Sequence, residues 1–571
     1  MHRSRFRFAL LSFLPLTFLS LAQAQGDPAQ VGRWGSLIKA ELVPIHVMLF
    51  PNGKLMYVDR HDQGTHDMVP RIWDPATNIT IKAPNPGFGL FCAGHSLLRN
   101  GDVFFSGGHI SDFIGENKLR IYNYRTNTWD AGLGTMYTGR WYPTNTTLPN
   151  GDVLIVSGSL SEFVNNPIPE IWDSRTRTLR KLEGAKQEIG LYPYMYVRPN
   201  DRVFIAGPDS MTRYLDIRGT GKWTDVGMTR RRLFRGYGSS VQYEPGKILI
   251  CGGGEKPPSA SVELIDLNQT APTWNYADSM HHARRQHTAT MLPDGNVVVI
   301  GGTSAPGFNN AAGAVYEAEM WDPKTGKWTV MAPAKTMRLY HSFSLLLPDA
   351  RLLTGGGGHP GDDVNYLAEH PDFEIWEPPY LFKGTRPVID AVPDTLYYGK
   401  TFALSTRNAG TLKVSLMRLA AITHSFDQNA DFNRLTVQRE SATSLLVTAP
   451  VDSAVTSPGP HMLFLLDSAG IPSVSKIVWV TSSSASGVIP YSGPRADRIG
   501  FAVAGNRLRV NGMDLDDGAK CFLINSKGER VADLKRISTG EFRLPDDRIP
   551  GTYIVDIRFR EHAHSGMVFI P

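Results

Sequence analysis

The segment "TMRLYHSFSLLLPDARLLTGGGG", Thr336 to Gly358, places a tyrosine and a histidine side by side just before an expected strand. The phenol of Tyr340 and the imidazole of His341 can both bind a transition-metal ion, and both can exchange protons with a substrate. Neighbouring residues on a regular strand point to opposite faces of the sheet. The pair could therefore serve one ion only where the strand starts or bends.

Three more residues elsewhere in the chain could join this pair at one site. They are Cys92 in "GLFCAGH", Tyr142 in "GRWYPTNTTLPNGD" and His424 in "AITHSFDQN". Taken singly, each is more often structural: a buried tyrosine or histidine that has found a hydrogen bond, or a buried thiol. A shared chemical role requires a fold that brings them together from distant positions in the sequence.

A repeated unit indicates such a fold. Seven segments each have an apolar strand, a tight turn and a second apolar strand that usually ends in glycine. Asn-Gly and Asp-Gly pairs recur in the turns because glycine adopts positive φ without a steric penalty. Successive turns are 48, 50, 50, 45, 49 and 55 residues apart, close to the period of about 50 in kelch blades. The turns are marked by Gly53, Gly101, Gly151, Asp201, Gly246, Gly295 and Ala350.

Each unit continues with a third strand, such as "RIWDP" or "EMWDP", and most have a fourth, such as "GKWTVM". The last third strand, "EIWEP", has no fourth strand after it, but "GRWGSLI" at Gly32 to Ile38 precedes the first unit. We expect this N-terminal strand to complete the last blade, because ring closure removes exposed sheet edges. The prediction is an all-β fold with a seven-bladed kelch-type β-propeller over residues 32–385. Residues at the starts of the inner strands would then meet near one axis.

Two smaller all-β regions follow the repeats. Residues 386–481 alternate apolar and polar residues between regular turn signals, which is typical of an Ig-like β-sandwich. The small polar stretch "TSSSASG", Thr481 to Gly487, predicts a flexible linker over residues 482–493. Residues 494–571 alternate again and predict a second small β-sandwich module, whose sequence indicates no particular role.

The N-terminus predicts export. "MHRSRFRFALLSFLPLTFLSLAQAQ" combines a basic start, an apolar run and small residues, which is typical of a signal peptide over residues 1–24. No later apolar run reaches the roughly 18 residues that a membrane span needs. The formal net charge of +5 falls to 5 − 3 = +2 when Arg3, Arg5 and Arg7 leave with the signal. We therefore expect a secreted, periplasmic or cell-surface monomer with no membrane span and no nucleic-acid partner.

The cysteine count is unusual for an exported protein. Three cysteines, Cys92, Cys251 and Cys521, leave at least one thiol without a disulfide partner. Three buried thiols would be the structural explanation. Because Cys251 in "KILICGGG" reads as part of a buried strand, we predict no disulfide between Cys251 and Cys521.

Taken together, these motifs resemble the copper radical oxidases, the family of galactose oxidase and glyoxal oxidase. The resemblance covers residues 32–481 and is strongest in "RLYHSFSLLLPD", "EIWEPPYLF", "ITHSFDQN" and "GPHMLFLLDSAGIPSVS". It implies a copper-dependent oxidoreductase that binds one copper ion and uses oxygen as the electron acceptor.

The resemblance also implies roles for five residues. Cys92 and Tyr142 would be joined by a thioether and form a protein-derived radical cofactor. Tyr142, His341 and His424 would be equatorial copper ligands, and Tyr340 would be the axial ligand. His424 would reach the propeller axis on a long hairpin of the sandwich. Imidazole and oxygen ligands in this arrangement suit Cu(II).

The chemistry agrees with these roles. The oxidation of an alcohol or a hydrated aldehyde removes two electrons, but Cu(II)/Cu(I) accepts only one, so a second one-electron store is needed. A tyrosine with an ortho sulfur provides it. Tyr340 would take the substrate hydroxyl proton, the Tyr142 radical would take a hydrogen atom from carbon, and oxygen would be reduced to hydrogen peroxide.

Three features place the chain closer to glyoxal oxidase than to galactose oxidase. Galactose oxidase has a tryptophan over the thioether, from a position where this chain has Leu160, and glyoxal oxidases also lack tryptophan there. The tryptophan directly before Tyr142, Trp141, is a feature in which the chain resembles the glyoxal oxidase group. The N-terminal sugar-binding domain of galactose oxidase has no counterpart in the sequence. We therefore expect Leu160 to alter the mouth of the substrate pocket.

An arginine cluster adds a second substrate hypothesis. Arg230, Arg231, Arg232 and Arg235 lie together in "MTRRRLFRGYG". The structural explanation is a solvated loop. The functional one is a positive pocket rim, in which Arg232 and Arg235 contact a small polar or anionic substrate.

Three functions remain open from the sequence. The first is the oxidation of small aldehydes, such as glyoxal, methylglyoxal or glycolaldehyde, to carboxylic acids with production of hydrogen peroxide. The second is the same chemistry on primary alcohols, including galactose. The third is a secreted kelch module that binds glycans or proteins without catalysis, but such a module would not need all five candidate site residues.

Overall fold

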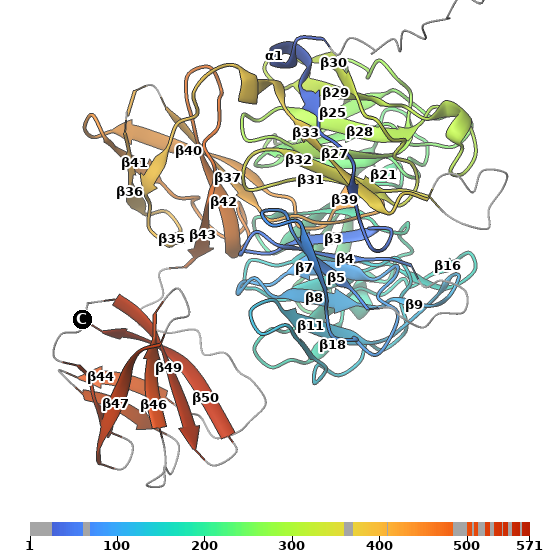
Figure 1. Ribbon diagram of the computed structural model, residues 1–571. Coiled ribbons are helices and arrows are strands. Elements are labelled where there is room, and N and C mark those ends of the chain that lie inside the picture. The colour runs from blue at the N-terminus through green and yellow to red at the C-terminus, as the bar shows by residue number, and fades with distance from the viewer. Residues whose placement is uncertain are drawn as a thin grey trace, which may run out of the picture. The chain divides into compact units, whose positions relative to one another are not determined.

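The computed structural model consists almost entirely of antiparallel β-sheets (Figure 1). It describes residues 26–60, 69–358, 369–407, 409–410, 412–482, 500–504, 507–511, 520–525, 530–538, 541–545, 551–559 and 562–570. The chain divides into two compact units, Met1–Ser483 and Ser484–Pro571. The predicted signal peptide and almost all of the predicted linker lie outside the described residues. The prediction of an all-β protein is confirmed.

The repeats of the first unit each form one sheet. The first sheet contains β3 (His46–Leu49), β4 (Leu55–Val58), β5 (Arg71–Asp74) and β6 (Ile79–Lys82). The second contains β7 (Gly94–Leu97), β8 (Val103–Ser106), β11 (Leu119–Asn123) and β12 (Thr128–Asp130). The third contains β13 (Thr144–Thr147), β14 (Val153–Val156), β17 (Glu170–Trp172) and β18 (Leu179–Lys181). Strands in each sheet follow the chain order from one edge to the other, as the repeat predicts.

Four further sheets continue the series. The fourth contains β19 (Tyr194–Arg198), β20 (Arg202–Gly207), β21 (Met211–Asp216) and β22 (Lys222–Met228), and the fifth contains β23 (Ser239–Glu244), β24 (Lys247–Cys251), β25 (Val262–Asp266) and β26 (Asn275–Ala277). The sixth contains β27 (Arg285–Met291), β28 (Val297–Thr303), β29 (Glu317–Asp322) and β30 (Lys327–Pro333). The last contains β31 (Ser342–Leu346), β32 (Leu352–Gly356) and β33 (Asp372–Glu377). Their arrangement as the blades of one ring remains our interpretation.

The N-terminal strand completes the last of these sheets. β1 (Arg33–Trp34) pairs with β33, with Arg33 opposite Glu377 and Trp34 opposite Trp376. The adjoining β2 (Ile38–Lys39) also pairs with β33. The indole N–H of Trp34 donates to the carbonyl of Ala332, 2.7 Å away. Strands some 340 residues apart in sequence thus share one sheet. This confirms the prediction that the N-terminal strand takes the place of the fourth strand in the last repeat.

Burial explains why these segments become strands. The inner strands β3, β7 and β13 are buried along their whole length, so both of their faces pack against neighbouring sheets. The recurring tryptophan of the third strand is buried in several sheets, and each indole fills space that a smaller side chain would leave open. The largest buried side chains include Trp73, Trp172, Trp321 and Trp376.

The predicted sandwich forms an eight-stranded assembly. Its strands are β34 (Ile389–Ala391), β35 (Thr395–Tyr397), β36 (Thr401–Thr406), β37 (Lys413–Arg418), β40 (Phe432–Arg439), β41 (Ser444–Thr448), β42 (Gly459–Leu466) and β43 (Lys476–Thr481). Its core includes Leu404, Leu416 and Leu463. Between β37 and β40 the chain leaves this core and forms a hairpin, β38 (Ala421–Thr423) and β39 (Phe426–Asp427).

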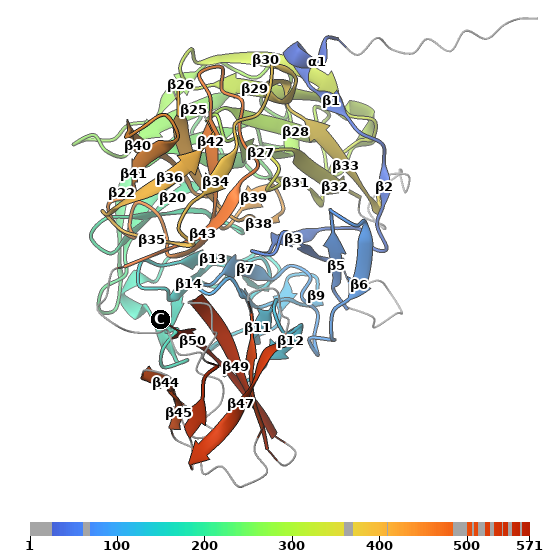
Figure 2. The ribbon, with the colours of Figure 1, turned by 60° about the vertical axis from the view of Figure 1, so that its left-hand side comes forward.

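That hairpin adds two strands to the first sheet of the repeats. β38 pairs with β3, with Ile422 opposite Val47 and Ala421 opposite Met48. Figure 2 shows β38 and β39 beside β3 and β31, among the inner strands of the repeats. The predicted long hairpin is therefore present, and it carries His424 at its tip between the two strands.

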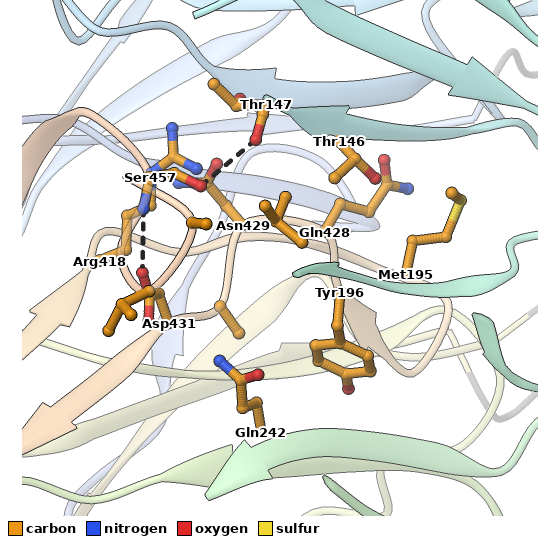
Figure 3. Close-up of a pocket in the computed structure, with 14 residues that line it drawn as sticks. Thr146, Thr147, Met195, Tyr196, Gln242, Arg418, Gln428, Asn429, Asp431 and Ser457 are labelled. Carbon is orange, nitrogen blue, oxygen red and sulfur yellow. Dashed lines mark hydrogen bonds between the residues drawn. The ribbon is translucent and has the colours of Figure 1, made fainter. Parts of the chain in front are cut away.

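Two amides fix the hairpin against the second and third sheets. Gln428 Oε1 accepts hydrogen bonds from the backbone N–H groups of His95, at 3.2 Å, and Asn145, at 3.0 Å. Asn429 Oδ1 accepts from the backbone N–H of Leu97 on β7 at 3.3 Å, and its Nδ2 donates to the carbonyl of Leu419 at 2.6 Å. A cavity of about 40 Å³ lies beside Gln428 and Asn429, and Figure 3 shows both amides at its edge. This volume holds one or two water molecules and no substrate, so the cavity belongs to the hairpin's packing.

Replacing Gln428 by leucine should destabilise the first unit by about 2–4 kcal/mol, because two buried N–H groups lose their acceptor. The measurement is the free energy of unfolding in urea. Gln438, which is exposed on β40, provides the matched control. Gln438→Leu should change stability by less than about 0.5 kcal/mol. Equal losses in the two variants would show that Gln428 does not hold the hairpin.

The second unit is a separate antiparallel assembly. Its strand order is β44 (Gly500–Ala504), β45 (Arg507–Asn511), β48 (Glu541–Arg543), β47 (Arg530–Ser538), β46 (Lys520–Ile524), β49 (Gly551–Phe559) and β50 (His562–Ile570). Leu508, Cys521, Phe542 and Val555 form its buried core. In neither unit do the described residues include a helix long and apolar enough to cross a membrane.

Candidate functional site

The candidate site is built from one position of the repeat. Six residues precede their turn markers by nine positions, and each has a positive φ, between 45° and 68°. Left-handed backbone costs a non-glycine residue roughly 1–2 kcal/mol, so its recurrence marks a constraint common to the repeats. The inner strand therefore bends sharply just before it begins. The six residues are Cys92, Tyr142, Tyr192, Tyr237, Gln286 and His341.

Backbone hydrogen bonds connect this position from one repeat to the next. The N–H of Tyr142 donates to the carbonyl of Cys92 at 2.9 Å, and the N–H of Tyr192 donates to the carbonyl of Tyr142 at 3.0 Å. The N–H of Gln286 donates to the carbonyl of Tyr237 at 2.7 Å. These bonds bring residues about fifty positions apart into direct contact, which the sequence spacing alone does not show.

Sequence reasoning found three of these six residues and missed Tyr192, Tyr237 and Gln286. The missing signal was the offset of nine residues from each turn, which is readable once the turns are aligned. Tyr192 and Tyr237 occupy the position that Tyr142 and Cys92 occupy in other repeats, so they were identifiable as candidates for the same site.

The side chains of four candidate metal ligands lie close together near these bends: Tyr142, Tyr340, His341 and His424. The hydroxyl groups of Tyr142 and Tyr340 are hydrogen-bonded to each other. The ring of His424 lies 4.5 Å from that of Tyr142 and 4.9 Å from that of His341, between centroids. Tyr340 and His341 stack at 3.7 Å. The bend at His341 thus lets two consecutive residues reach one site.

Hydrogen bonds to both the N–H and the carbonyl of Cys92 hold this residue next to Tyr142. Its N–H donates to Nε2 of His46 at 2.9 Å, and its carbonyl accepts from the N–H of Tyr142. The Cys92 thiol is hydrogen-bonded to the Tyr142 side chain, and burial raises the pKa of that thiol. A thiol fixed beside a phenol ring is the arrangement that a thioether between them requires. All three cysteines are free thiols in the structure, as predicted for Cys251 and Cys521.

Hydrogen bonds orient both imidazoles. Nδ1 of His341 lies 2.9 Å from the carbonyl of Gly358. Because a carbonyl only accepts hydrogen bonds, Nδ1 is protonated and donates to it. Nδ1 of His424 lies 2.6 Å from the hydroxyl of Thr423. Because a partner engages Nδ1 in each ring, Nε2 is the nitrogen that each histidine would offer to a metal. Thr423 was not identified from the sequence.

The donor set determines which metal fits. In the described ranges, no group of three or more His, Cys, Asp or Glu side chains could hold an ion, so a four-donor site here needs the tyrosines. Two imidazole nitrogens and two phenol oxygens suit Cu(II). Burial raises the pKa of Tyr142 and of Tyr340 well above the usual range. A bound cation would oppose that shift and favour loss of a phenol proton.

The ring of Tyr142 lies between two aromatic residues. Trp141 stacks on it at 3.8 Å and 13°, and Tyr192 stacks at 4.6 Å and 27°, between ring centroids. The indole N–H of Trp141 donates to Nδ1 of His109 at 3.1 Å. The half-buried Leu160 follows Ser159, which pairs with Trp141. The indole over Tyr142 therefore comes from its own neighbour in the chain.

The expected positive rim needs correction at Arg235. Its guanidinium is buried, forms an ion pair with Glu263 and donates to the carbonyl of Gly252 at 2.7 Å, so it cannot contact a substrate. Buried arginines two residues before Tyr142 and Gln286 form matching pairs, Arg140 with Glu170 and Arg284 with Glu319. The pair is a structural element of the repeat, because a buried charge needs a partner. Arg232 is exposed.

The comparisons with known proteins identify the family. The model described as "Glyoxal oxidase N-terminus" matches residues 72–380, which is more than half of the chain. The chain belongs to the glyoxal oxidase family. The model described as "Galactose oxidase-like, Early set domain" matches residues 386–480, the sandwich that carries the hairpin.

Individual relatives of this glyoxal oxidase family member carry several names. A "Galactose oxidase" of Gibberella zeae is 29% identical, over 79% of this chain and 71% of its own. An "Aldehyde oxidase GLOX" of Vitis pseudoreticulata is 28% identical, over 68% of this chain and 81% of its own. A solved structure of a fungal alcohol oxidase in complex with copper is 26% identical, with a TM-score of 0.73, over 79% of this chain and all of its own.

Family membership confirms several predictions. The chain is a copper radical oxidase, and therefore an oxygen-using oxidoreductase with a copper ion and a cysteine–tyrosine radical cofactor. Its fold is that of the galactose oxidase group. The alternative of a non-catalytic kelch binding module is wrong.

Proposed function

We propose that this glyoxal oxidase family member oxidises small aldehydes to carboxylic acids and reduces oxygen to hydrogen peroxide. The observation that carries the proposal is the convergence of Tyr142, Tyr340, His341 and His424 around one point, with Cys92 held against Tyr142. The five residues come from three repeats and the sandwich hairpin.

The same residues would hold the copper ion. Tyr142, Tyr340, His341 and His424 would hold it, through two phenol oxygens and two imidazole nitrogens. A bound copper ion supplies one of the two one-electron oxidising equivalents that the reaction needs. The thioether-linked pair Cys92 and Tyr142 supplies the other, because an ortho sulfur makes the phenol easier to oxidise.

The protein groups divide the reaction into a proton transfer and a hydrogen transfer. An aldehyde RCHO hydrates in water to RCH(OH)₂, which offers a hydroxyl proton to the oxygen of Tyr340. The oxygen radical of Tyr142 then takes the hydrogen atom from carbon. The sum is RCH(OH)₂ + O₂ → RCOOH + H₂O₂, in which carbon loses two electrons and oxygen gains them.

Aromatic side chains cover the reacting groups. The half-buried Phe308 lies 4.3 Å from the ring of Tyr340, and Trp141 covers one face of Tyr142. A radical on Tyr142 would be shielded from water on both faces by Trp141 and Tyr192. This shielding supports a long-lived radical, because side reactions with solvent are excluded.

The substrate class separates two candidate functions. The glyoxal oxidase model and the aldehyde oxidase relative favour small aldehydes. The galactose oxidase and alcohol oxidase relatives favour primary alcohols, which the same five residues could oxidise. Leu160 at the expected indole position, with Trp141 as the stacking residue, supports the aldehyde assignment.

On the copper-loaded enzyme, kcat/KM should be higher for glyoxal, methylglyoxal or glycolaldehyde than for galactose, by about tenfold or more, or some 1.4 kcal/mol of barrier. The measurement is oxygen uptake at matched concentrations, with peroxide determined in parallel. Tyr397→Phe, at an exposed tyrosine of the sandwich, serves as the control and should leave all rates unchanged. A preference for galactose would make the alcohol assignment the better one and would leave the copper ligands as proposed.

Export remains part of the proposal. The predicted signal peptide over residues 1–24 lies outside the described residues. Its support is the sequence pattern of a basic start, an apolar run and small residues. The monomeric state likewise remains a prediction.

A further inference from the structure

Arg285 is a buried cation beside the candidate site. Its side chain is 3% exposed, and its Nε has no hydrogen-bond partner among the described residues. Its Nη1 donates to the carbonyl of Gly307 at 2.5 Å, and its guanidinium carbon lies 5.1 Å from the ring centroid of Tyr237. A carbonyl and an aromatic face stabilise a cation only in part. The charge of Arg285 therefore remains incompletely compensated.

Other buried arginines of the repeats are compensated by carboxylates. Arg140, Arg235 and Arg284 pair with Glu170, Glu263 and Glu319, and Arg338 pairs with Asp372 at 2.6 Å. No such ion pair joins Arg285 to a carboxylate within the part of the chain that the structure describes. The exposed Glu255 acts on it only from a longer distance. Since buried charges are normally paired, the missing partner of Arg285 points to an anion that the protein binds.

The neighbouring residue supplies a second donor. Gln286 is 2% exposed, and its Oε1 accepts from the backbone N–H of Asn309 at 3.2 Å, which identifies the remaining amide atom, Nε2, as the nitrogen. That Nε2 has no partner among the described residues, and neither has Oδ1 of Asn309. Two buried donors and one buried acceptor thus have unused hydrogen-bonding capacity, and they belong to two neighbouring residues and to the segment that both of them contact. Such groups are costly unless a ligand or water satisfies them.

Both side chains end on one short segment next to Tyr340. Arg285 contacts Gly307 and Gln286 contacts Asn309, and the residue between them, Phe308, lies 4.3 Å from the ring of Tyr340. The Tyr237 ring beneath Arg285 lies 5.3 Å from that of Tyr340. Gln286 also occupies the repeat position that carries Tyr142 and His341 elsewhere. The cluster therefore borders the proposed proton acceptor.

We propose that Arg285, Gln286 and Asn309 form a carboxylate-binding subsite beside Tyr340. Arg285 and Gln286 donate to the carboxylate oxygens, and Oδ1 of Asn309 accepts from a hydroxyl of the hydrated aldehyde. The subsite favours aldehydes with a carboxylate on the neighbouring carbon. It rests on the proposed function only for the aldehyde group, because carboxylate binding does not require turnover. The expected positive residue at the pocket is thus Arg285 in place of Arg235.

Steady-state kinetics with two matched aldehydes test the subsite. On the copper-loaded enzyme, Arg285→Met should lower kcat/KM for glyoxylate about 100-fold, mainly through KM, because a desolvated charge partner is removed. Glycolaldehyde, which is neutral, should change by less than about threefold. Gln286→Leu should lower kcat/KM for glyoxylate about tenfold. Arg439→Met, at an exposed arginine of the sandwich, is the control and should leave both substrates unchanged.

Equilibrium binding gives a readout that is independent of turnover. Oxamate has the shape of glyoxylate but no aldehyde hydrogen, and calorimetry should show its affinity falling about 100-fold in Arg285→Met. Arg285→Lys, which keeps the charge, should lose less, and it replaces the methionine variant if that variant does not fold. A parallel loss for both aldehydes, or unchanged oxamate affinity in Arg285→Met, would overturn the subsite. If the enzyme oxidised no aldehyde but bound oxamate through Arg285, the proposed function would fail and the subsite would stand.

Discussion

Copper loading of the protein under oxygen should lower its intact mass by two hydrogens, about 2 Da, as a carbon–sulfur bond forms between Cys92 and Tyr142. The reason is geometric: the thiol already contacts the phenol, and hydrogen bonds to His46 and Tyr142 fix the Cys92 backbone. The bond removes one hydrogen from sulfur and one from the ring, and oxygen accepts the two electrons. Peptide mapping under reducing conditions should then recover the two peptides as one.

Cys92→Ser should abolish the mass change and lower kcat by more than about 100-fold, or some 2.7 kcal/mol of barrier. The expected cause is loss of the ortho sulfur, which leaves Tyr142 too difficult to oxidise. Cys251→Ser provides the control, since Cys251 is equally buried but lies beside His287 in another repeat. Recovery of separate peptides from the copper-loaded wild type, with Cys92 open to alkylation, would rule out the radical mechanism.

His424→Ala and Tyr340→Phe should separate metal binding from proton transfer. His424→Ala removes an equatorial ligand and should lower copper affinity by well over 100-fold, since loss of even an outer-shell partner costs about 10–100-fold. Tyr340→Phe should keep copper and the radical but lose about 10²–10⁴ in kcat, the usual contribution of a general acid or base. Copper content, the radical's absorption and oxygen uptake are measured on both variants.

Equal loss of copper in the two variants would show that Tyr340 is a main structural ligand and would end its assignment as the base. Tyr397→Phe controls for removal of a hydroxyl at an exposed tyrosine. Thermal unfolding of the copper-free proteins should be similar in wild type and Tyr340→Phe. The comparison therefore reports chemistry rather than folding.

The repeat made most of the fold readable from the sequence. Turn pairs such as Asn-Gly fix where each hairpin reverses, and the lone strand before the first repeat predicted its pairing with β33, which the register of Trp34 and Trp376 confirms. Ala350 occupies a glycine turn position with φ of 68°, and hydrogen bonds hold it there: its N–H donates to the carbonyl of Leu347 at 2.9 Å, and its carbonyl accepts from the hydroxyl of Tyr380 at 2.6 Å. Local turn chemistry and strand period carry this information along the chain.

The candidate ligands were also readable, because each belongs to a motif with its own residue types. The roles of the arginines were not. Arg235 and Arg285 both stand near the start of an inner strand, and the sequence does not show which of them meets a carboxylate. Glu263 lies beside Arg235 because the third strand of the same sheet brings it there, whereas no described carboxylate pairs with Arg285.

The sequence by itself determined the repeat, the position of its turns and the identity of the residues able to bind copper. The tertiary structure alone decided which of these residues meet, which indole covers Tyr142 and which arginine lacks a partner. The physical reason is that turn formation and strand period depend on neighbouring residues, whereas the contacts of a side chain depend on how separate sheets and the sandwich hairpin pack. In this chain that packing brings His424 to within 4.5 Å of the Tyr142 ring, across 282 positions of sequence.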